Sequence, residues 1–492
     1  MNPRVTHSPT SVTRRDWLGD AARGLATIAA IDLLGRQGRL ASADDGPTEA
    51  SEGLHHPARA KRIIQIFLGG GLSHLDSFDY KPELDRRHGQ EMPESFGKAD
   101  VFFGKVGRLH RSHFEFRQRG ESGLWVSELF PHLAGQADRL TVIRSMHAES
   151  ANHIPAIFQA NTGFRQMGFP AMGAWLDYGL GTENEDLPGF VVLPDERGIP
   201  NAAGGAFNWT SGFLPATHQG VAFDTRGERP IRDLEPSLPL GSGDMSVVER
   251  RRREFQQRLD ARHRAERDEA DPLVARIRSF ELAARMQRAI PEAIGLQDET
   301  ESTRRDYGLD DPATRDVARN CLLARRLVER GVRMVQVWTG DGVSWDAHDD
   351  VLGDGYKSHK GEALRIDRPV AALVADLAQR GLLESTLVVL STEFGRTPFA
   401  QADQGKLSRG RDHHPQGFTN VMIGAGLRPG IAFGATDEIG YAAVESPVTT
   451  YDLHATILHL MGIDHERLTF VHDGIRRRLT NVHGVPIREV MS

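Results

Sequence analysis

Short apolar runs separated by polar, glycine-rich segments recur along most of the chain. Three of them end directly in such segments: residues 62–68 (RIIQIFL), 332–338 (VRMVQVW) and 387–390 (LVVL). Short runs rich in β-branched residues and bounded by glycine and acids are typical of buried parallel strands. Two further runs, at residues 139–144 and 190–193, are also predicted to be strands, as is the run at 419–423.

Between these runs, apolar residues recur at helical spacing. Helices are predicted at residues 154–160, 314–330, 362–380 and 449–461. Strands that alternate with amphipathic helices in this way predict an α/β protein.

The character of the chain changes between residues 204 and 301. A segment rich in Gly and Pro leads into residues 247–270, dense in Arg and Glu, and then into residues 273–289, which have helical spacing. A charged run of this kind invites a nucleic-acid or partner-binding interpretation, but its alternating signs favour a solvated helix. We therefore predict that residues 204–301 form a helical insertion on the α/β core.

Composition and charge narrow the class of protein. The chain has 492 residues, is 39% hydrophobic and carries a formal net charge of −7. These values fit a globular protein with a large core and give no sign of a general nucleic-acid binder. Cys321 is the single cysteine, so no internal disulfide can form, and its helical surroundings predict a small buried side chain.

The N-terminal segment has the features of an export signal. Residues 13–18 (TRRDWL) resemble the twin-arginine motif, a moderately apolar stretch covers residues 21–34, and residues 41–43 (ASA) resemble a cleavage site. The alternative is an amphipathic helix with a chance Arg-Arg pair. The apolar stretch is too short and too charged for a stable membrane span. We expect export by the twin-arginine route and a periplasmic or extracellular location.

These features also set the expected boundaries. Residues 1–43 are predicted to be the signal peptide, 44–60 a polar linker, 61–484 the α/β domain and 485–492 a C-terminal tail.

Histidines and acids follow, or closely precede, four of the predicted strands. In an open α/β sheet, ligands bind beyond the carboxyl ends of the strands, so these side chains are expected to meet at one edge. Imidazole and carboxylate are the ligands that a divalent ion such as zinc or manganese selects. The residues are His74, Asp76, Asp346, His348, Glu393, His413 and His414, and Arg396 lies three residues after Glu393.

Each of these groups also has a structural explanation. Asp346 and His348 are two residues apart and share a face of an extended segment, but Asp346 alternatively caps a turn. Glu393 at a buried strand end requires compensation, by a metal or by a pair with Arg396. One of the adjacent His413 and His414 is expected to bind metal or substrate, and the sequence does not say which.

Three more histidines lie in or directly before predicted helices. His153, at the start of the 154–160 helix, is a candidate base, metal ligand or helix-start residue. His454 and His459 are expected at the rim of the core or at the surface, not as ligands.

Several segments together resemble a family of exported, sulfatase-like bacterial proteins known as domain-of-unknown-function family 1501. That family is grouped by resemblance with the alkaline phosphatase superfamily. The segments are RRDWL, GGGLSHLDSFDYKP, NHIPAIFQANTG, SWDAH, STEFGRTP, GRDHHPQGFTNVMIGAG and DLHATILHLMGID. The resemblance implies a three-layer α/β/α sandwich with a mostly parallel central sheet, similar to alkaline phosphatase, carrying the helical insertion.

The resemblance also implies a set of metal ligands. Superfamily members hold one or two divalent metals, commonly zinc, with carboxylates and histidines at strand ends, beside a Ser, Thr or Cys nucleophile. Asp76 matches the first-strand aspartate, Asp346 and His348 match an aspartate–histidine pair that the superfamily spaces more widely, and Glu393 matches a later aspartate. His413 or His414 matches the last ligand, and His74 is expected in or beside this shell.

Two positions depart from the superfamily pattern. Phe394 occupies the place of a metal-binding histidine and cannot ligate. His153 occupies the place of the nucleophile. A histidine there forms a phospho-intermediate or acts as a base for water; the alternative is that covalent chemistry has been lost.

The sequence therefore predicts a metal-dependent hydrolase of phosphate or sulfate esters that acts outside the cytoplasm. The ion is expected to be zinc, with manganese or calcium as alternatives, and His153 and Arg396 are the expected catalytic residues. The substrate is expected to be a small anionic ester or glycan, with other envelope proteins as possible partners and no nucleic acid. The alternative is a non-catalytic envelope binding or assembly protein on a degenerate hydrolase fold.

Overall fold

The computed structural model describes residues 53–99, 101, 105–195, 197, 203–225, 251, 254–256, 258–262, 272–340, 342–401 and 407–492. The predicted signal peptide lies outside the described residues. The fold and the site described below belong to one compact unit, residues 49–472 with 476–492.

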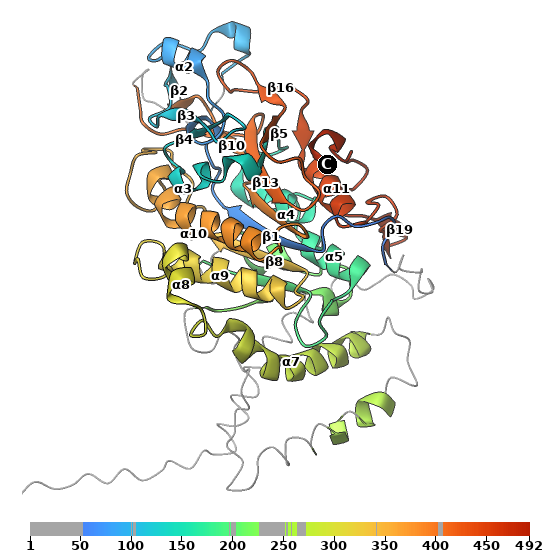
Figure 1. Ribbon diagram of the computed structural model, residues 1–492. Helices are drawn as coiled ribbons and strands as arrows, with labels where there is room; N and C mark the ends of the chain where they lie inside the picture. The colour runs from blue at the N-terminus through green and yellow to red at the C-terminus, as the bar shows by residue number, and fades with distance from the viewer. Residues whose placement is uncertain are drawn as a thin grey trace, which may run out of the picture. The chain divides into compact units, whose positions relative to one another are not determined.

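A nine-stranded sheet forms the centre of this unit (Figure 1). Eight of the strands lie in the order β14-β5-β13-β9-β1-β8-β6-β7, and β17 pairs with β5. Only β13 in this sheet runs antiparallel to its neighbours, so the predicted mostly parallel sheet is confirmed. The strands are β1 (Arg62–Leu68), β5 (Leu140–His147), β6 (Phe190–Leu193), β7 (Val221–Ala222), β8 (Met334–Thr339), β9 (Thr386–Ser391), β13 (Phe418–Gly424), β14 (Ile431–Phe433) and β17 (Val448–Thr449).

The register brings the carboxyl ends of the central strands level with one another. Leu68 at the end of β1 pairs with Thr339 at the end of β8, and Phe67 pairs with Ser391 at the end of β9. The start of the antiparallel β13 lies beside the end of β5. The segments that follow β1, β5, β8 and β9, and the one that precedes β13, therefore meet at a single rim of the sheet.

Helices cover both faces of the sheet, because successive side chains of each buried strand point to opposite sides. Ile64 and Ile66 of β1 belong to the core with α3 (Pro131–Ala134), α7 (Pro272–Ile294), α9 (Arg315–Glu329) and α10 (His359–Gln379). Ile63 and Phe67 belong to the core with α4 (His153–Thr162), α5 (Met172–Leu180) and α11 (Thr450–Leu460). This is the expected three-layer α/β/α arrangement.

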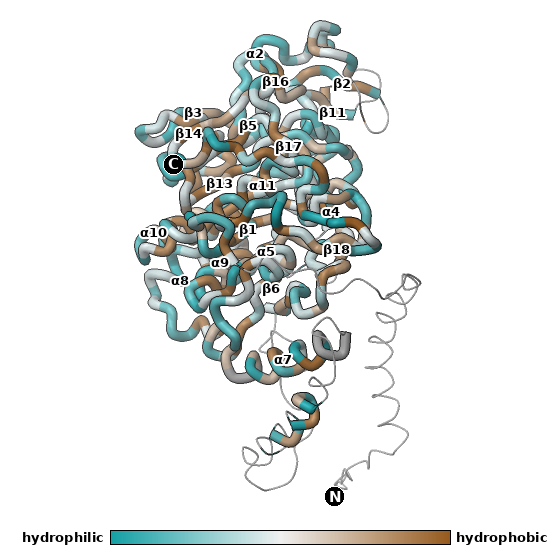
Figure 2. Tube along the Cα trace, turned by 90° about the vertical axis from the view of Figure 1, so that its right-hand side faces the viewer, coloured by the Kyte–Doolittle hydropathy of each residue, from teal (hydrophilic) through white to brown (hydrophobic). Residues whose placement is uncertain are grey.

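The predicted insertion at residues 204–301 is only partly an addition to the core. Its first part, with short helices η4 (Gly205–Trp209) and η5 (Ala216–His218), leads into β7, which joins the edge of the sheet. Its last part is α7, which carries hydrophilic and hydrophobic positions in alternation (Figure 2) and buries Met286, Ile290 and Ala293 against the core. The predicted solvated charged run lies mostly outside the described residues.

Smaller elements decorate this core. They are α2 (Pro82–Arg86), α8 (Glu301–Tyr307), the short helices η1 (His74–Asp76), η2 (Glu94–Phe96), η3 (Ala137–Arg139) and η6 (Arg488–Val490), and the strands β2 (Val106–Leu109), β3 (Phe116–Arg119), β4 (Leu124–Ser127), β10 (Gly395–Arg396), β11 (Phe399–Gln401), β12 (His413–His414), β15 (Ala435–Thr436), β16 (Ala443–Glu445), β18 (Phe470–His472) and β19 (Ile475–Arg477). Cys321 in α9 is fully buried, as predicted. No helix among the described residues is both long and apolar enough to cross a membrane.

Candidate metal centre

Three histidine side chains converge on one carboxylate oxygen at the rim of the sheet. The Nε2 atoms of His348 and His413 each lie 3.0 Å from Oδ1 of Asp346, and Nε2 of His153 lies 3.3 Å from it. The Nε2 atoms of His348 and His413 are 2.9 Å apart. We refer to Asp346, His153, His348 and His413 as the Asp346 cluster.

Each member of the cluster comes from a segment that the sheet delivers to this rim. Asp346 and His348 follow β8, and His413 lies in β12, which pairs with β10 after the end of β9. His153 is the first residue of α4, whose start is capped by the Asn152 side chain accepting from Ile154 N at 3.2 Å. The helix cap fixes the backbone at His153 and the pairing of β12 with β10 fixes it at His413, so both imidazoles are held in place at the rim.

The far side of two of these rings faces a hydrogen-bond acceptor. Nδ1 of His153 lies 2.7 Å from Oε1 of Glu393, and Nδ1 of His413 lies 2.8 Å from the carbonyl oxygen of Ala151. An Nδ1–H that donates to such a partner leaves the lone pair of Nε2 facing Asp346; the tautomer is assigned here from those partners. A carboxylate or carbonyl behind a histidine is the usual arrangement that orients a metal ligand.

The third ring is held less firmly, because Nδ1 of His348 makes no hydrogen bond to a described residue. Nδ1 of His348 lies 3.4 Å from Oδ1 of Asp412, and its Nε2 faces the cluster. Imidazole lone pairs and a carboxylate directed at one another repel unless a cation lies among them. The arrangement therefore favours a bound cation, either protons on the imidazoles or a metal ion.

The pKa values follow from these contacts. With protons rather than a metal ion between the rings and the carboxylate, burial raises the pKa of Asp346, but hydrogen bonds from His153, His348 and His413 outweigh burial and hold that pKa well below its usual value. Burial lowers the pKa of His413 to about 4. For His153, burial lowers the pKa, but hydrogen bonds to Asp346 and Glu393 raise it above the usual value on balance.

The spacing of three of the donor atoms fits a metal ion. Tetrahedral ligands about 2.1 Å from zinc lie about 3.4 Å from one another. Asp346 Oδ1, His348 Nε2 and His413 Nε2 are separated by 2.9 to 3.0 Å, so small outward movements would suffice. Imidazole and carboxylate are also the donor set that zinc prefers.

Glu393 does not take the position predicted for a metal ligand. Its carboxylate accepts from Gly70 N at 2.9 Å, from Thr392 Oγ1 at 3.2 Å and from His153 Nδ1 at 2.7 Å, and the side chain is fully buried. Position 70 requires glycine, because its φ is 119° and a Cβ there would lie 2.6 Å from the Trp345 nitrogen. These contacts make Glu393 a positioning residue for His153.

Arg396, predicted to be catalytic, is fully buried and cannot reach a ligand in solvent. It donates through Nε to Gly71 O at 2.9 Å, through Nη1 to Arg411 O at 3.2 Å and through Nη2 to Asp346 Oδ1 at 2.8 Å. The predicted alternative, a pair with Glu393, is also not what forms. Arg396 is instead a fixed positive charge behind Asp346.

Asp76 is not brought into the Asp346 cluster, contrary to the prediction. Its two carboxylate oxygens lie 2.5 and 3.2 Å from Nε and Nη2 of Arg411, and they also accept from Ser73 Oγ at 2.6 Å and Ser112 Oγ at 3.0 Å. Burial opposes ionisation, but Arg411 holds the pKa of Asp76 well below its usual value. A guanidinium occupies the space in which an ion would have to bind.

His74 and His414 are also held elsewhere. Nε2 of His74 lies 2.8 Å from Gly440 O, and Nε2 of His414 contacts the neighbouring carbonyl of Tyr441. Burial lowers the pKa of His74 to about 4 and that of His414 to about 3, so both rings are neutral. This geometry does not support their predicted role as metal ligands. The two rings instead hydrogen-bond the backbone carbonyls of residues 440 and 441.

Lys357 is a site residue that the sequence interpretation missed. Its Nζ lies 3.2 Å from Oδ2 of Asp346, whereas the imidazoles contact Oδ1. The lysine lies 11 residues after Asp346 and does not directly follow a predicted strand. The only sequence signal for it is its closeness to the charged segment SWDAHDD.

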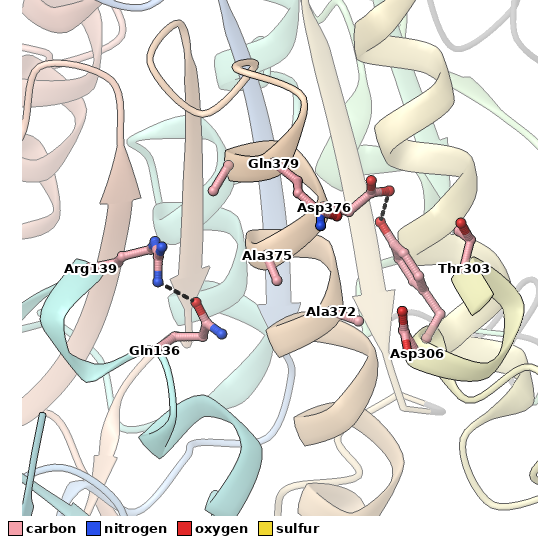
Figure 3. A pocket seen from close by; sticks show the side chains of 10 residues that line it. Gln136, Arg139, Thr303, Asp306, Ala372, Ala375, Asp376 and Gln379 are labelled. Atoms are coloured by element: carbon pink, nitrogen blue, oxygen red, sulfur yellow. Dashed lines mark hydrogen bonds between the residues drawn. The ribbon is translucent and has the colours of Figure 1, made fainter.

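The cluster is partly exposed to solvent at His348, and the neighbouring Lys357 is also exposed. The side chains of His348 and Lys357 are 26% and 45% exposed, whereas that of Asp346 is 8% exposed. A separate hollow of about 470 Å³ lies beside α8 and the C-terminal half of α10, where Tyr307 Oη donates to Asp376 at 3.0 Å (Figure 3). Its lining includes no member of the Asp346 cluster.

Comparisons with known proteins give a family and distant structural likenesses. Residues 60–491 match the family described as protein of unknown function (DUF1501). No curated protein matches the sequence significantly.

Several solved structures share part of the architecture at low similarity. A protein of the alkaline phosphatase superfamily from Vibrio parahaemolyticus is 10% identical, with 87% of this chain and 73% of that chain covered and a TM-score of 0.35. Alkaline phosphatase from the Antarctic bacterium TAB5 is 9% identical, with 82% and 98% covered and a TM-score of 0.34. Ps i-CgsB is 12% identical, with 83% and 74% covered and a TM-score of 0.35. The fold assignment therefore rests on the chain's own sheet and helices.

Proposed function

This chain belongs to the family described as protein of unknown function DUF1501, and from its Asp346 cluster we propose that it is a metal-dependent hydrolase of phosphate or sulfate esters. The observation that carries the proposal is the convergence of three imidazole Nε2 atoms on Asp346 Oδ1 at 3.0 to 3.3 Å. The rings of His153 and His413 each have an acceptor behind Nδ1, which is the arrangement that prepares histidines for metal or proton chemistry.

Asp346, His348 and His413 would hold the ion. Three protein ligands with one position left open are typical of catalytic zinc sites, whereas structural sites use four. Zinc fits this donor set best, and manganese and calcium, which favour more oxygen ligands, are the alternatives. A divalent ion bound there would supply Lewis-acid polarisation of the ester and of water.

His153 would act as the general base, with Glu393 holding its ring. Nε2 of His153 takes a proton from the attacking water as the water oxygen bonds to the phosphorus or sulfur. The bond from that atom to the ester oxygen breaks, and the departing alkoxide takes a proton from solvent. His153 then returns its proton to solvent, so one ester and one water give one alcohol and one phosphate or sulfate.

The expected substrate is a small anionic ester, free or carried by a glycan. Such a ligand would approach at the exposed part of the cluster, past His348. The N-terminal export signature supports action outside the cytoplasm, after passage by the twin-arginine route.

The proposal is tested on the protein purified from the exported fraction of its host. Metal content is measured by mass spectrometry, and turnover is measured on p-nitrophenyl phosphate, p-nitrophenyl sulfate and a panel of sugar phosphates and sulfates. We expect about one equivalent of zinc per chain and turnover of at least one ester. His153→Ala should abolish turnover with the metal retained.

A non-catalytic binding protein is the second candidate, and two observations favour it. Phe394 packs its ring against His153 and His413, with centroids 4.8 and 4.9 Å apart, in the place where the superfamily has a ligand. Arg411 neutralises Asp76. Bound metal without turnover on every ester of the panel would establish this alternative and exclude the hydrolase.

A further inference from the structure

Lys357 is the one permanently charged group at the Asp346 cluster that reaches solvent, among the residues that the structure describes. We propose that Lys357 binds the anionic group of the ligand at this site. The inference rests on the proposed function for its setting, since it names the residue that selects a phosphate or sulfate. Its Nζ lies 3.2 Å from Asp346 Oδ2, and its side chain is 45% exposed.

The only other permanently charged cation in contact with Asp346, within the described part of the chain, is unsuited to this task. Arg396 is fully buried, and its donors are directed at Asp346 and at backbone carbonyls, including those of Gly71 and Arg411. A guanidinium that is already satisfied cannot gain by exchanging these partners for a ligand. Arg396 stabilises the ionised Asp346, and recognition of an anion is left to Lys357.

The geometry of Lys357 leaves donors available. An ammonium group has three N–H donors, and one contact with Asp346 Oδ2 uses one of them. The two oxygens of Asp346 are divided: Oδ1 contacts the imidazoles and Arg396, and Oδ2 contacts Lys357. An oxyanion bound at the exposed part of the cluster would therefore contact both the imidazoles and the remaining N–H donors of Lys357.

The loop around Lys357 is braced in a way that points its side chain inward. Lys357 has a φ of 61°, a left-handed conformation that is unfavourable for a residue with a Cβ. The next residue, Ser358, caps α10 by accepting from Gly361 N at 3.1 Å and donates to Gly355 O at 2.7 Å. An uncommon backbone conformation held by its neighbours at a site of converging polar groups indicates a positional requirement for this lysine.

The chain offers a matched control for a test. Lys360 lies three residues further on, is 54% exposed, and pairs with Asp354 at 2.6 Å away from the cluster. Lys357→Met and Lys360→Met remove the same charge from neighbouring positions. Lys357→Arg keeps a cation at the site.

The measurement is the binding of inorganic phosphate and inorganic sulfate to the metal-containing protein by calorimetry, with metal content recorded for every variant. We expect Lys357→Met to weaken binding of the preferred anion at least about tenfold, Lys360→Met to change it less than about twofold, and Lys357→Arg to fall between them. Metal content should be the same in all, since Lys357 is not a ligand.

Other outcomes overturn the inference. Equal anion binding by Lys357→Met and the wild type, or loss of metal in Lys357→Met, would reduce Lys357 to a structural partner of Asp346. A wild type that binds neither anion would also overturn it. If the anion binds through Lys357 but no ester is turned over, the hydrolase proposal fails and the Lys357 inference stands. If Lys357→Met turns over an ester with an unchanged KM, the hydrolase proposal stands and the Lys357 inference fails.

Discussion

Oε1 of Glu393 lies 2.7 Å from Nδ1 of His153, and this contact turns the other ring nitrogen of His153 toward Asp346. The carboxylate that follows β9 therefore contributes through a histidine that follows β5, across 240 residues of sequence. A carboxylate behind an imidazole fixes its tautomer and stabilises the protonated ring that forms during proton transfer.

Glu393→Gln should lower kcat on the best ester by about 100-fold and leave the metal content unchanged. The amide still fills the space and accepts one hydrogen bond, but it no longer carries the charge that favours protonated His153. Steady-state kinetics and metal analysis check both parts. Loss of the ion from a folded Glu393→Gln protein would instead restore Glu393 to the ligand role that the sequence suggested.

His413→Ala should lose the bound ion, whereas His414→Ala should retain it. His413 directs Nε2 at Asp346, and His414 donates to the Tyr441 carbonyl instead. Zinc affinity is measured by competition with a chelating dye, with circular dichroism as the control for folding. The assignment of His413 fails if the folded His414→Ala protein is the one that loses its zinc.

Asp76→Asn should destabilise the protein without removing the metal. The change breaks a buried ion pair and leaves the Arg411 guanidinium without its carboxylate, at an expected cost of about 3–5 kcal/mol in the free energy of unfolding. Urea denaturation measures this cost. The double variant Asp76→Asn with Arg411→Met should recover part of the loss; a metal-free but equally stable Asp76→Asn protein would show that Asp76 is a ligand after all.

His454 should make the stability of the protein fall in acid. It is fully buried, donates from Nε2 to Ala160 O at 2.9 Å, and burial lowers its pKa to about 4. The unfolded chain, with a histidine pKa of about 6.5, binds the proton more readily, so the stabilisation is complete above that pH and is lost as the pH falls through about 4.

The measurement is the free energy of unfolding of the wild type and of His454→Gln between pH 7 and pH 4. Gln can still donate to the carbonyl but does not titrate. The wild type should lose about 3 kcal/mol more than the variant over this range. Parallel pH profiles for the two proteins would show that His454 is not buried and neutral. The sequence had predicted His454 at the rim of the core or at the surface, whereas the structure buries it fully.

The apolar pattern alone predicted most of the sheet and the rim at which the chemistry lies. The runs at 62–68, 332–338 and 387–390 overlap β1, β8 and β9 within a few residues. Apolar residues occupy both alternating faces of these runs, which predicts strands buried on both faces and therefore helices on both sides of the sheet. Polar residues placed directly after such strands meet at one rim, whichever residues they are.

The sequence left open which polar residues share a focus, because that depends on partners far away along the chain. Neighbouring residues of a strand point to opposite sides, and only the pairing of β12 with β10, with Arg396 opposite His413, decided that His413 and not His414 faces Asp346. Whether a buried carboxylate is balanced by an ion or by a guanidinium is decided by which side chain lies nearest in space. Arg411 reaches Asp76 across 335 residues, and no local pattern in the chain could have specified that contact.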